Sequence, residues 1–174
     1  ARQRLGDDGP ALVRRARGED ARRVNPDRET KSISAETTFD TDLSDAAALE
    51  RHLWRLAEKL ATRLKAAGFA AGGVVLKLKT AGFATRTRTQ RLHTPTALPD
   101  TLFAAAREML AREADGTAFR LIGIGAAPLM PAASADQPDL ADPDASRRVA
   151  AQRAIDALRS RFGVAAIGRG RGLK

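Results

Sequence analysis

The sequence predicts an α+β domain of the ferredoxin-like split βαβ type: a four-stranded antiparallel sheet with two helices on one face, plus helical tails. Two observations predict this class. Three segments alternate apolar and polar residues with the period of two that strands show, and a fourth, at residues 118–127, is a short run that is apolar at both odd and even positions. Two further segments repeat apolar residues every three or four positions, as helices do. Their order along the chain is strand, helix, strand, strand, helix, strand. Right-handed crossovers would place both helices on one face and leave the other face open.

The first strand is expected at residues 31–40 (KSISAETTFD). Its odd-numbered positions are mostly apolar and its even-numbered positions are polar, so one face can be buried. Ser32 and Ser34 lie on the polar face, where their hydroxyls and backbone N–H groups could hold a phosphate. An ordinary polar strand face is an equally good interpretation of these two serines.

The first helix follows, with Ser44 as its expected N-cap and Gly68 as a left-handed residue at its end. Five leucines at spacings of three and four predict its core-facing stripe: Leu49, Leu53, Leu56, Leu60 and Leu64. His52 and Trp54 lie on the same helix without Cys or carboxylate companions, which indicates a structural role for both.

Residues 74–92 (VVLKLKTAGFATRTRTQRL) predict two strands joined by a two-residue turn at Ala81-Gly82. If Thr80 is opposite Phe83, then Lys77 is opposite Arg86 and the threonines share the face of the leucines. The open face would then carry four cations of the two middle strands: Lys77, Lys79, Arg86 and Arg88.

The four cations favour a polyanionic partner. Like charges opposed on a sheet cost a few tenths of a kcal/mol per pair, roughly, so a bound phosphate backbone would relieve the repulsion. A solvated strand face is the simpler alternative, but such a face usually mixes both signs of charge. No Asp or Glu occurs in residues 74–92, which favours binding of a phosphate backbone at these four side chains.

A second helix is expected to begin near Pro99 and to end before Gly116. Its predicted buried face consists of Leu102, Phe103, Ala106, Met109 and Leu110. Residues 118–127 (AFRLIGIGAA) predict the last strand; the GIG within it is not a dinucleotide-binding loop, because no helix follows the glycines.

The flanking segments predict three further parts. Residues 1–18 contain a short helix from about Pro10 that looks like the end of an upstream helical region, and residues 19–30 read as a linker. Residues 128–146 are acidic and rich in proline and alanine, which predicts a flexible linker after the domain at 31–127. Residues 147–174 predict an amphipathic helix and a basic tail.

The composition limits the classes of partner and of functional site that this chain can have. The formal net charge of +9 indicates an acidic partner, most commonly nucleic acid. Aromatic residues make up 4% of the chain, which disfavours a sheet that stacks RNA bases on aromatic rings. No apolar run approaches the ~20 residues that cross a bilayer, so no membrane partner is expected. The absence of cysteine excludes thiolate metal sites and a cysteine nucleophile and fits a reducing cytoplasm.

Four segments, in this order and at these separations, resemble a known family: RRARGED at 14–20, KSISAETTFD at 31–40, LKLKTAGFATRTRT at 76–89 and ADGTAFRLIGIG at 114–125. The chain is similar to Y-family translesion DNA polymerases of the bacterial DNA polymerase IV type. The resemblance covers the end of the thumb, the tether, the little finger and the carboxyl-terminal extension.

The resemblance implies an error-prone DNA-directed DNA polymerase, a nucleotidyltransferase and mutator that acts in translesion synthesis and DNA repair after DNA damage. Its little finger would grip the backbones of primer-template DNA. The palm, which would hold Mg²⁺ and the catalytic carboxylates, is not among these residues, so no catalytic residue, metal site or cofactor is expected here. A monomer in the cytoplasm, associated with the nucleoid, is expected.

Relatives of this type also carry a peptide that docks on the DNA sliding clamp. Gln137, Asp139 and Leu140 match it, but Ala141 replaces the usual aromatic residue, so weak docking is expected. Two alternatives remain open: a catalytically inactive Y-family relative that acts as a clamp-tethered adaptor, and an unrelated basic ferredoxin-like RNA-binding domain.

Overall fold

The computed structural model describes residues 6–23, 29–136 and 144–170. The chain divides into two compact units, Ala1–Thr30 and Lys31–Lys174. In the first unit, the short helix η1 (Gly6–Asp8) leads into helix α2 (Gly9–Ala16). Pro10 lies in the first turn of α2, where a residue without an N–H group loses no hydrogen bond. The predicted short helix is therefore present.

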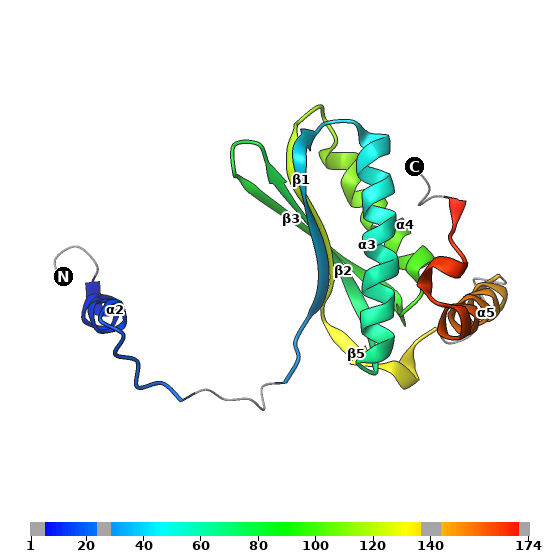
Figure 1. Cartoon of the computed structure of the whole chain (residues 1–174), viewed down its shortest axis with the longest axis horizontal. Coiled ribbons are helices and arrows are strands. Elements are labelled where there is room, and N and C mark those ends of the chain that lie inside the picture. Colours follow the sequence, from blue (N-terminus) through cyan, green and yellow to red (C-terminus); the bar gives the residue numbers. More distant parts are fainter. Residues whose placement is uncertain (1–5, 24–28, 137–143, 171–174) are drawn as a thin grey trace. The chain divides into compact units, whose positions relative to one another are not determined.

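The second unit has the predicted element order, and the α+β class is confirmed. It contains strand β1 (Ile33–Leu43), helix α3 (Ala46–Ala66), strands β2 (Phe69–Thr80) and β3 (Thr85–Thr96), helix α4 (Pro99–Glu113) and strand β4 (Phe119–Ala126). The strands lie in the order β1-β4-β2-β3, and all neighbours are antiparallel. Helices α3 and α4 lie together on one face of the sheet (Figure 1).

The core lies between these helices and the sheet. The predicted leucine stripe of α3 is buried, as is the predicted apolar face of α4. Val74, Leu76 and Leu78 of β2 meet them from the sheet and are at most 1% exposed.

The cap of α3 differs from the prediction: Asp45, not Ser44, accepts hydrogen bonds from the N–H groups of Ala47 and Ala48. A carboxylate directly before the helix also suits the positive end of the helix dipole.

The turn between β2 and β3 is longer than predicted. Thr80 and Ala84 close a loop of three residues: the Thr80 N–H donates to the Ala84 carbonyl, and the Phe83 N–H donates to the Thr80 carbonyl, both at 2.9 Å. Phe83 itself takes the left-handed φ of 67°. The extra loop residue shifts the register by one, so that Leu78 is opposite Arg86 and Lys77 is opposite Thr87. A shift of one residue moves every side chain of β3 to the other face.

The segment after β4 is not a free linker at its start. Strand β5 (Leu129–Pro131) pairs with the first residues of β2, so the described sheet has five strands instead of the predicted four. Helix η2 (Ala132–Ser134) follows. Asp136 then donates its N–H to the Pro95 carbonyl at 2.8 Å, and its carboxylate accepts from the Thr96 hydroxyl. The chain therefore stays attached to the domain as far as Asp136.

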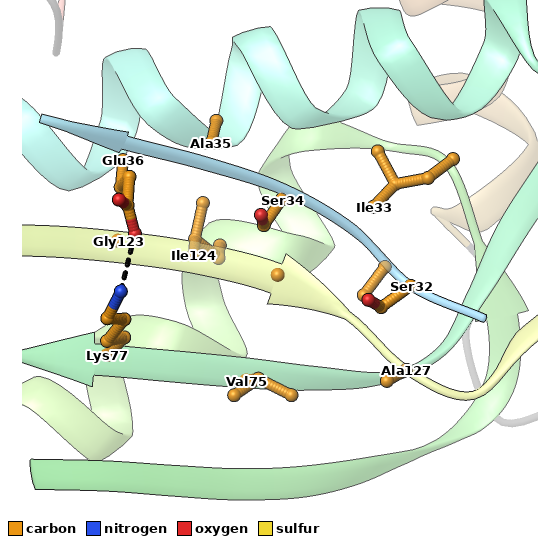
Figure 2. Close-up of a pocket in the computed structure, with 12 residues that line it drawn as sticks. Ser32, Ile33, Ser34, Ala35, Glu36, Val75, Lys77, Gly123, Ile124 and Ala127 are labelled. Carbon is orange, nitrogen blue, oxygen red and sulfur yellow. Dashed lines mark hydrogen bonds and ion pairs between the residues drawn. The ribbon is translucent and has the colours of Figure 1, made fainter. Parts of the chain in front are cut away.

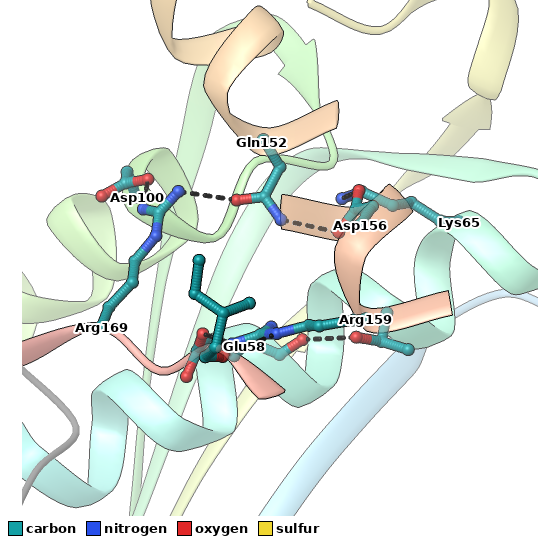
Figure 3. Close-up of polar contacts among 9 residues, drawn as sticks. Glu58, Lys65, Asp100, Gln152, Asp156, Arg159 and Arg169 are labelled. Carbon is teal, nitrogen blue, oxygen red and sulfur yellow. Dashed lines mark hydrogen bonds and ion pairs between the residues drawn. The ribbon is translucent and has the colours of Figure 1, made fainter. Parts of the chain in front are cut away.

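Helix α5 (Ala145–Phe162) and the short helix η3 (Val164–Ala166) belong to the same unit. The predicted helix is present, but it packs on the domain through polar side chains more than through its predicted apolar face. Gln152 is only 4% exposed, whereas Leu158 is 42% exposed. Arg159 contacts Glu58 of α3 at 2.8 Å and also donates to the Ile167 carbonyl. Figure 3 shows that Asp156 and Arg159 of α5 reach toward α3.

Candidate nucleic-acid interface

The face of the sheet opposite α3 and α4 carries most of the predicted site. Residues opposed in neighbouring strands project to the same side. Lys77 and Lys79 of β2 therefore share this open face with Thr87 and Thr85 of β3. Arg91 of β3, opposite Gly73, lies on the same face and is exposed. The open face thus combines ammonium and guanidinium groups with a row of hydroxyls.

A hollow of about 320 Å³ runs along the open face between β1 and β2. Gly123 and Gly125 of β4 form its floor, because neither glycine has a side chain to fill the space between the residues opposite them in β1 and β2. Figure 2 shows Ser32 and Ser34 along one side of the hollow and Val75 and Lys77 along the other. A narrow, extended ligand could approach the sheet backbone at Gly125, since glycine lets other atoms come close.

Ser32 and Ser34 lie where the alternation predicts them. Both are exposed, and both line the hollow. Ser34 is opposite Gly125 in the β1–β4 pair, so the missing side chain of that glycine leaves the Ser34 hydroxyl accessible. Whether the two serines hold a phosphate stays a prediction.

An acidic residue that is not among the predicted site residues also lies on the open face. The Glu36 carboxylate contacts the Lys77 ammonium at 2.9 Å, across Gly123 (Figure 2). Both side chains are nearly half exposed, at 48% and 44%. Because 41 residues separate the pair in the sequence, no local pattern could have found it. Glu36 therefore lowers the positive charge of the hollow.

Arg86 and Arg88 were predicted to share the open face with Lys77 and Lys79, and this prediction is wrong. The shifted register puts them on the helix-covered side, opposite Leu78 and Leu76. There they hold the Glu113 carboxylate at the end of α4, at 3.2 Å and 2.7 Å. The Glu113 side chain is 8% exposed, so the two guanidinium groups neutralise a nearly buried charge.

A second carboxylate stands beside Arg86. The hydroxyl and the backbone N–H of Thr117 donate to Asp115 and hold the pKa of that carboxyl below its ordinary value. The Arg86 guanidinium, at 3.9 Å, lowers this pKa further. Arg86 is thus already engaged by two acidic groups on the side of the sheet away from the hollow.

The predicted clamp-binding peptide and the predicted absence of a metal site concern other parts of the chain. Gln137, Asp139 and Leu140 lie outside the described residues. Within the described residues there is no cluster of three or more His, Cys, Asp and Glu side chains that could hold a metal ion. None of the described helices is both long and apolar enough to span a bilayer.

Comparison with known proteins adds to this geometry. Residues 30–140 match the model of the impB/mucB/samB family C-terminal domain. DNA polymerase IV 1 of Mesorhizobium japonicum is 50% identical over 175 residues, which cover 97% of this chain and 40% of that protein. DNA polymerase IV of Brucella melitensis is 49% identical over 162 residues, which cover 93% of this chain and 36% of that protein.

A solved structure shows the same fold. The insertion ternary complex of Dbh DNA polymerase superposes with a TM-score of 0.51 at 12% identity, over 70% of this chain and 35% of that one. The resemblance to polymerases of the DNA polymerase IV type is confirmed, although the chain spans only about two fifths of the length of those two relatives. With a family model that covers residues 30–140, the chain belongs to the impB/mucB/samB family and contains its C-terminal domain.

Proposed function

We propose that the open face of the sheet binds the sugar-phosphate backbone of primer-template DNA, as the little finger of an error-prone polymerase of the DNA polymerase IV type. The observation that carries this proposal is the distribution of charge on the open face. Lys79 and Arg91 are there without a carboxylate partner among the described residues, beside the hydroxyl-lined hollow. Relatives named DNA polymerase IV support DNA as the partner over RNA.

The proposed contacts differ from those that the sequence predicts. Lys77, Lys79, Ser32 and Ser34 remain, and Arg91 joins them. Arg86 and Arg88 leave the interface, because Glu113 holds them on the other side of the sheet. Contacts of this kind position a protein on DNA without reading its sequence, so binding with little sequence preference is expected.

The salt dependence of binding tests this proposal. Fluorescence anisotropy with a labelled primer-template should give a linear plot of log affinity against log salt concentration, with a slope of about −3 to −4 for three or four neutralised phosphates. The double variant Lys77→Gln, Arg91→Gln should make this slope shallower by about two, because each released contact contributes about 0.9.

The matched control removes two charges from the helix layer instead. Lys59 of α3 and Arg153 of α5 are exposed, so Lys59→Gln, Arg153→Gln changes the net charge equally. This control should leave the slope unchanged. Equal slopes for the two double variants would mean that the open face does not bind DNA.

The same proposal includes the location and the reaction of the whole enzyme: it would act in the cytoplasm, associated with the nucleoid, and would synthesise DNA past damaged bases.

We also propose that residues 137–140 dock weakly on the sliding clamp. The observation that supports docking is the attachment of Asp136 to the domain, which gives this peptide a defined starting point. A titration of clamp against a peptide of residues 135–142 should show weak binding that Gln137→Ala, Leu140→Ala abolishes; equal binding of both peptides would contradict it.

A further inference from the structure

The tip of the β2–β3 hairpin carries an aromatic residue in an unfavourable conformation. The Phe83 side chain is exposed, with 61% of its surface accessible, and its backbone has a φ of 67°. Large side chains rarely adopt this left-handed conformation, and such residues gather at functional sites. Neither core packing nor turn chemistry explains a phenylalanine here, since Gly or Asn would suit the position better.

Hydrogen bonds to the backbone hold this loop in place. The Ala84 N–H donates to the Thr80 hydroxyl at 3.1 Å, in addition to the two bonds between Thr80, Phe83 and Ala84. The Ala81 N–H donates to the Ala118 carbonyl at 2.9 Å and joins the loop to the residue that precedes β4. The backbone of the loop that carries Phe83 is therefore held by two separate parts of the chain.

Two cations from different strands lie against the Phe83 ring. The Arg120 guanidinium carbon is 4.1 Å from the ring centroid, and the Lys79 ammonium nitrogen is 5.0 Å from it. Arg120 belongs to β4 and Lys79 to β2. In the part of the chain that the structure describes, neither side chain has an ion pair with a carboxylate. The negative face of the ring offsets part of the repulsion between the two charges.

Two positive groups within 5.0 Å of the same ring centroid suit an anion with several oxygen atoms. Arg offers a planar set of N–H donors that matches phosphate, and Lys adds a compact charge. Because the ring already restricts both side chains, less rotamer entropy is lost when they close on a ligand. The cluster lies at the hairpin end of the same strand β2 that lines the hollow.

We propose that Lys79, Phe83 and Arg120 form a phosphate-binding site at the hairpin tip, which holds a backbone phosphate of duplex DNA, and that Phe83 is its positioning residue. This inference rests on DNA binding by the open face and adds a defined contact to it. Lys79 and Arg120 touch the phosphate, whereas Phe83 acts through them.

Anisotropy with a labelled primer-template separates the two roles. Arg120→Gln should weaken binding about fivefold at 0.1 M salt and make the salt slope shallower by about one, because one phosphate contact is lost. Phe83→Asn should weaken binding about threefold with the slope unchanged, because both charges remain but are no longer restricted. Asn tolerates the left-handed conformation, so the melting temperature of Phe83→Asn should equal or exceed that of the original chain.

A variant that lacks both cations tests whether Phe83 acts on DNA binding only through Lys79 and Arg120. In Lys79→Gln, Arg120→Gln, the further change Phe83→Asn should have no effect on affinity, because no cation is left to position. A threefold loss there would show that the ring contacts DNA directly and would overturn the positioning role. Binding of Phe83→Asn and Arg120→Gln at the original affinity, with Lys77→Gln, Arg91→Gln still impaired, would overturn this site alone. Absence of DNA binding by the unaltered chain would overturn both the site and the proposed function.

Discussion

The two sides of the sheet carry positive charge in different ways. On the helix-covered side, Arg86 and Arg88 share Glu113, and Arg159 of the docked α5 meets Glu58. On the open face, among the described residues, the only ion pair is that of Lys77 with Glu36. Lys79 lies against the Phe83 ring instead of a carboxylate.

This difference follows from burial. A charge that leaves water needs an opposite charge close by, whereas an exposed charge does not. Glu113 and Arg159 have side chains only 8% and 16% exposed, so their partners are structurally required. The position of carboxylates therefore distinguishes the proposed binding face from the helix-covered side, which the net charge of +9 alone does not do.

The largest expected effect is on the helix-covered side. Glu113→Gln should lower the free energy of unfolding by about 2 kcal/mol, because Arg86 and Arg88 lose their shared partner while Arg86 stays largely covered. Urea denaturation measures this change. Glu108→Gln, at an exposed position of the same helix, is the matched control and should change stability by less than about 0.5 kcal/mol. Equal effects of the two variants would contradict the structural role of Glu113.

The next effect concerns α5. Arg159→Gln removes the ion pair with Glu58 and the hydrogen bonds to the Ile167 carbonyl, which should cost about 1 kcal/mol of local stability. Hydrogen exchange should become faster in residues 145–162 and stay the same in the sheet. Arg153→Gln, at an exposed position of α5, should not change it. Faster exchange throughout the sheet would mean that α5 is part of the core's cooperative unit.

A smaller effect is expected on the open face. Glu36→Gln should change the free energy of unfolding by less than about 0.5 kcal/mol, because the pair with Lys77 is about half exposed. The same variant should bind primer-template DNA about threefold more tightly at low salt, since Lys77 no longer has a competing carboxylate. Weaker binding would show instead that Glu36 holds Lys77 in the orientation that DNA needs.

Most of the fold follows from local sequence signals. Four features are where the sequence predicts them: the leucine stripe of α3, the apolar face of α4, the start of α4 at Pro99 with its end before Gly116, and the left-handed Gly68. Each of these features depends on residues within a few positions of one another. The candidate site depends in addition on strand register and on contacts between residues far apart in the sequence.

The candidate site could be predicted only in part, for one physical reason. Its faces depend on the register of β2 and β3, and the register depends on a single loop residue. The sequence predicts a two-residue turn at Ala81-Gly82, but Phe83 takes the left-handed position that glycine usually occupies, so the loop has three residues. Contacts between distant strands, such as those of Glu36 with Lys77 and of Arg120 with Phe83, have no local signal at all.

The smallest expected effect tests whether a positive charge without a carboxylate is disfavoured on the helix-covered side. Burial lowers the pKa of His52 in α3, and the nearby Arg55 and Arg51 lower it further, while its ring lies 4.8 Å from that of Phe39 in β1. The unfolded chain, with an ordinary histidine pKa of about 6.5, takes up a proton first as the pH falls. The free energy of unfolding should therefore be unaffected above about pH 6.5, fall below it, and level off under the folded pKa. Urea denaturation at about pH 7.5 and 5.5 should show a smaller drop in the free energy of unfolding for His52→Gln than for the original chain. An equal drop in His52→Gln would show that this side of the sheet tolerates an unpaired positive charge at His52.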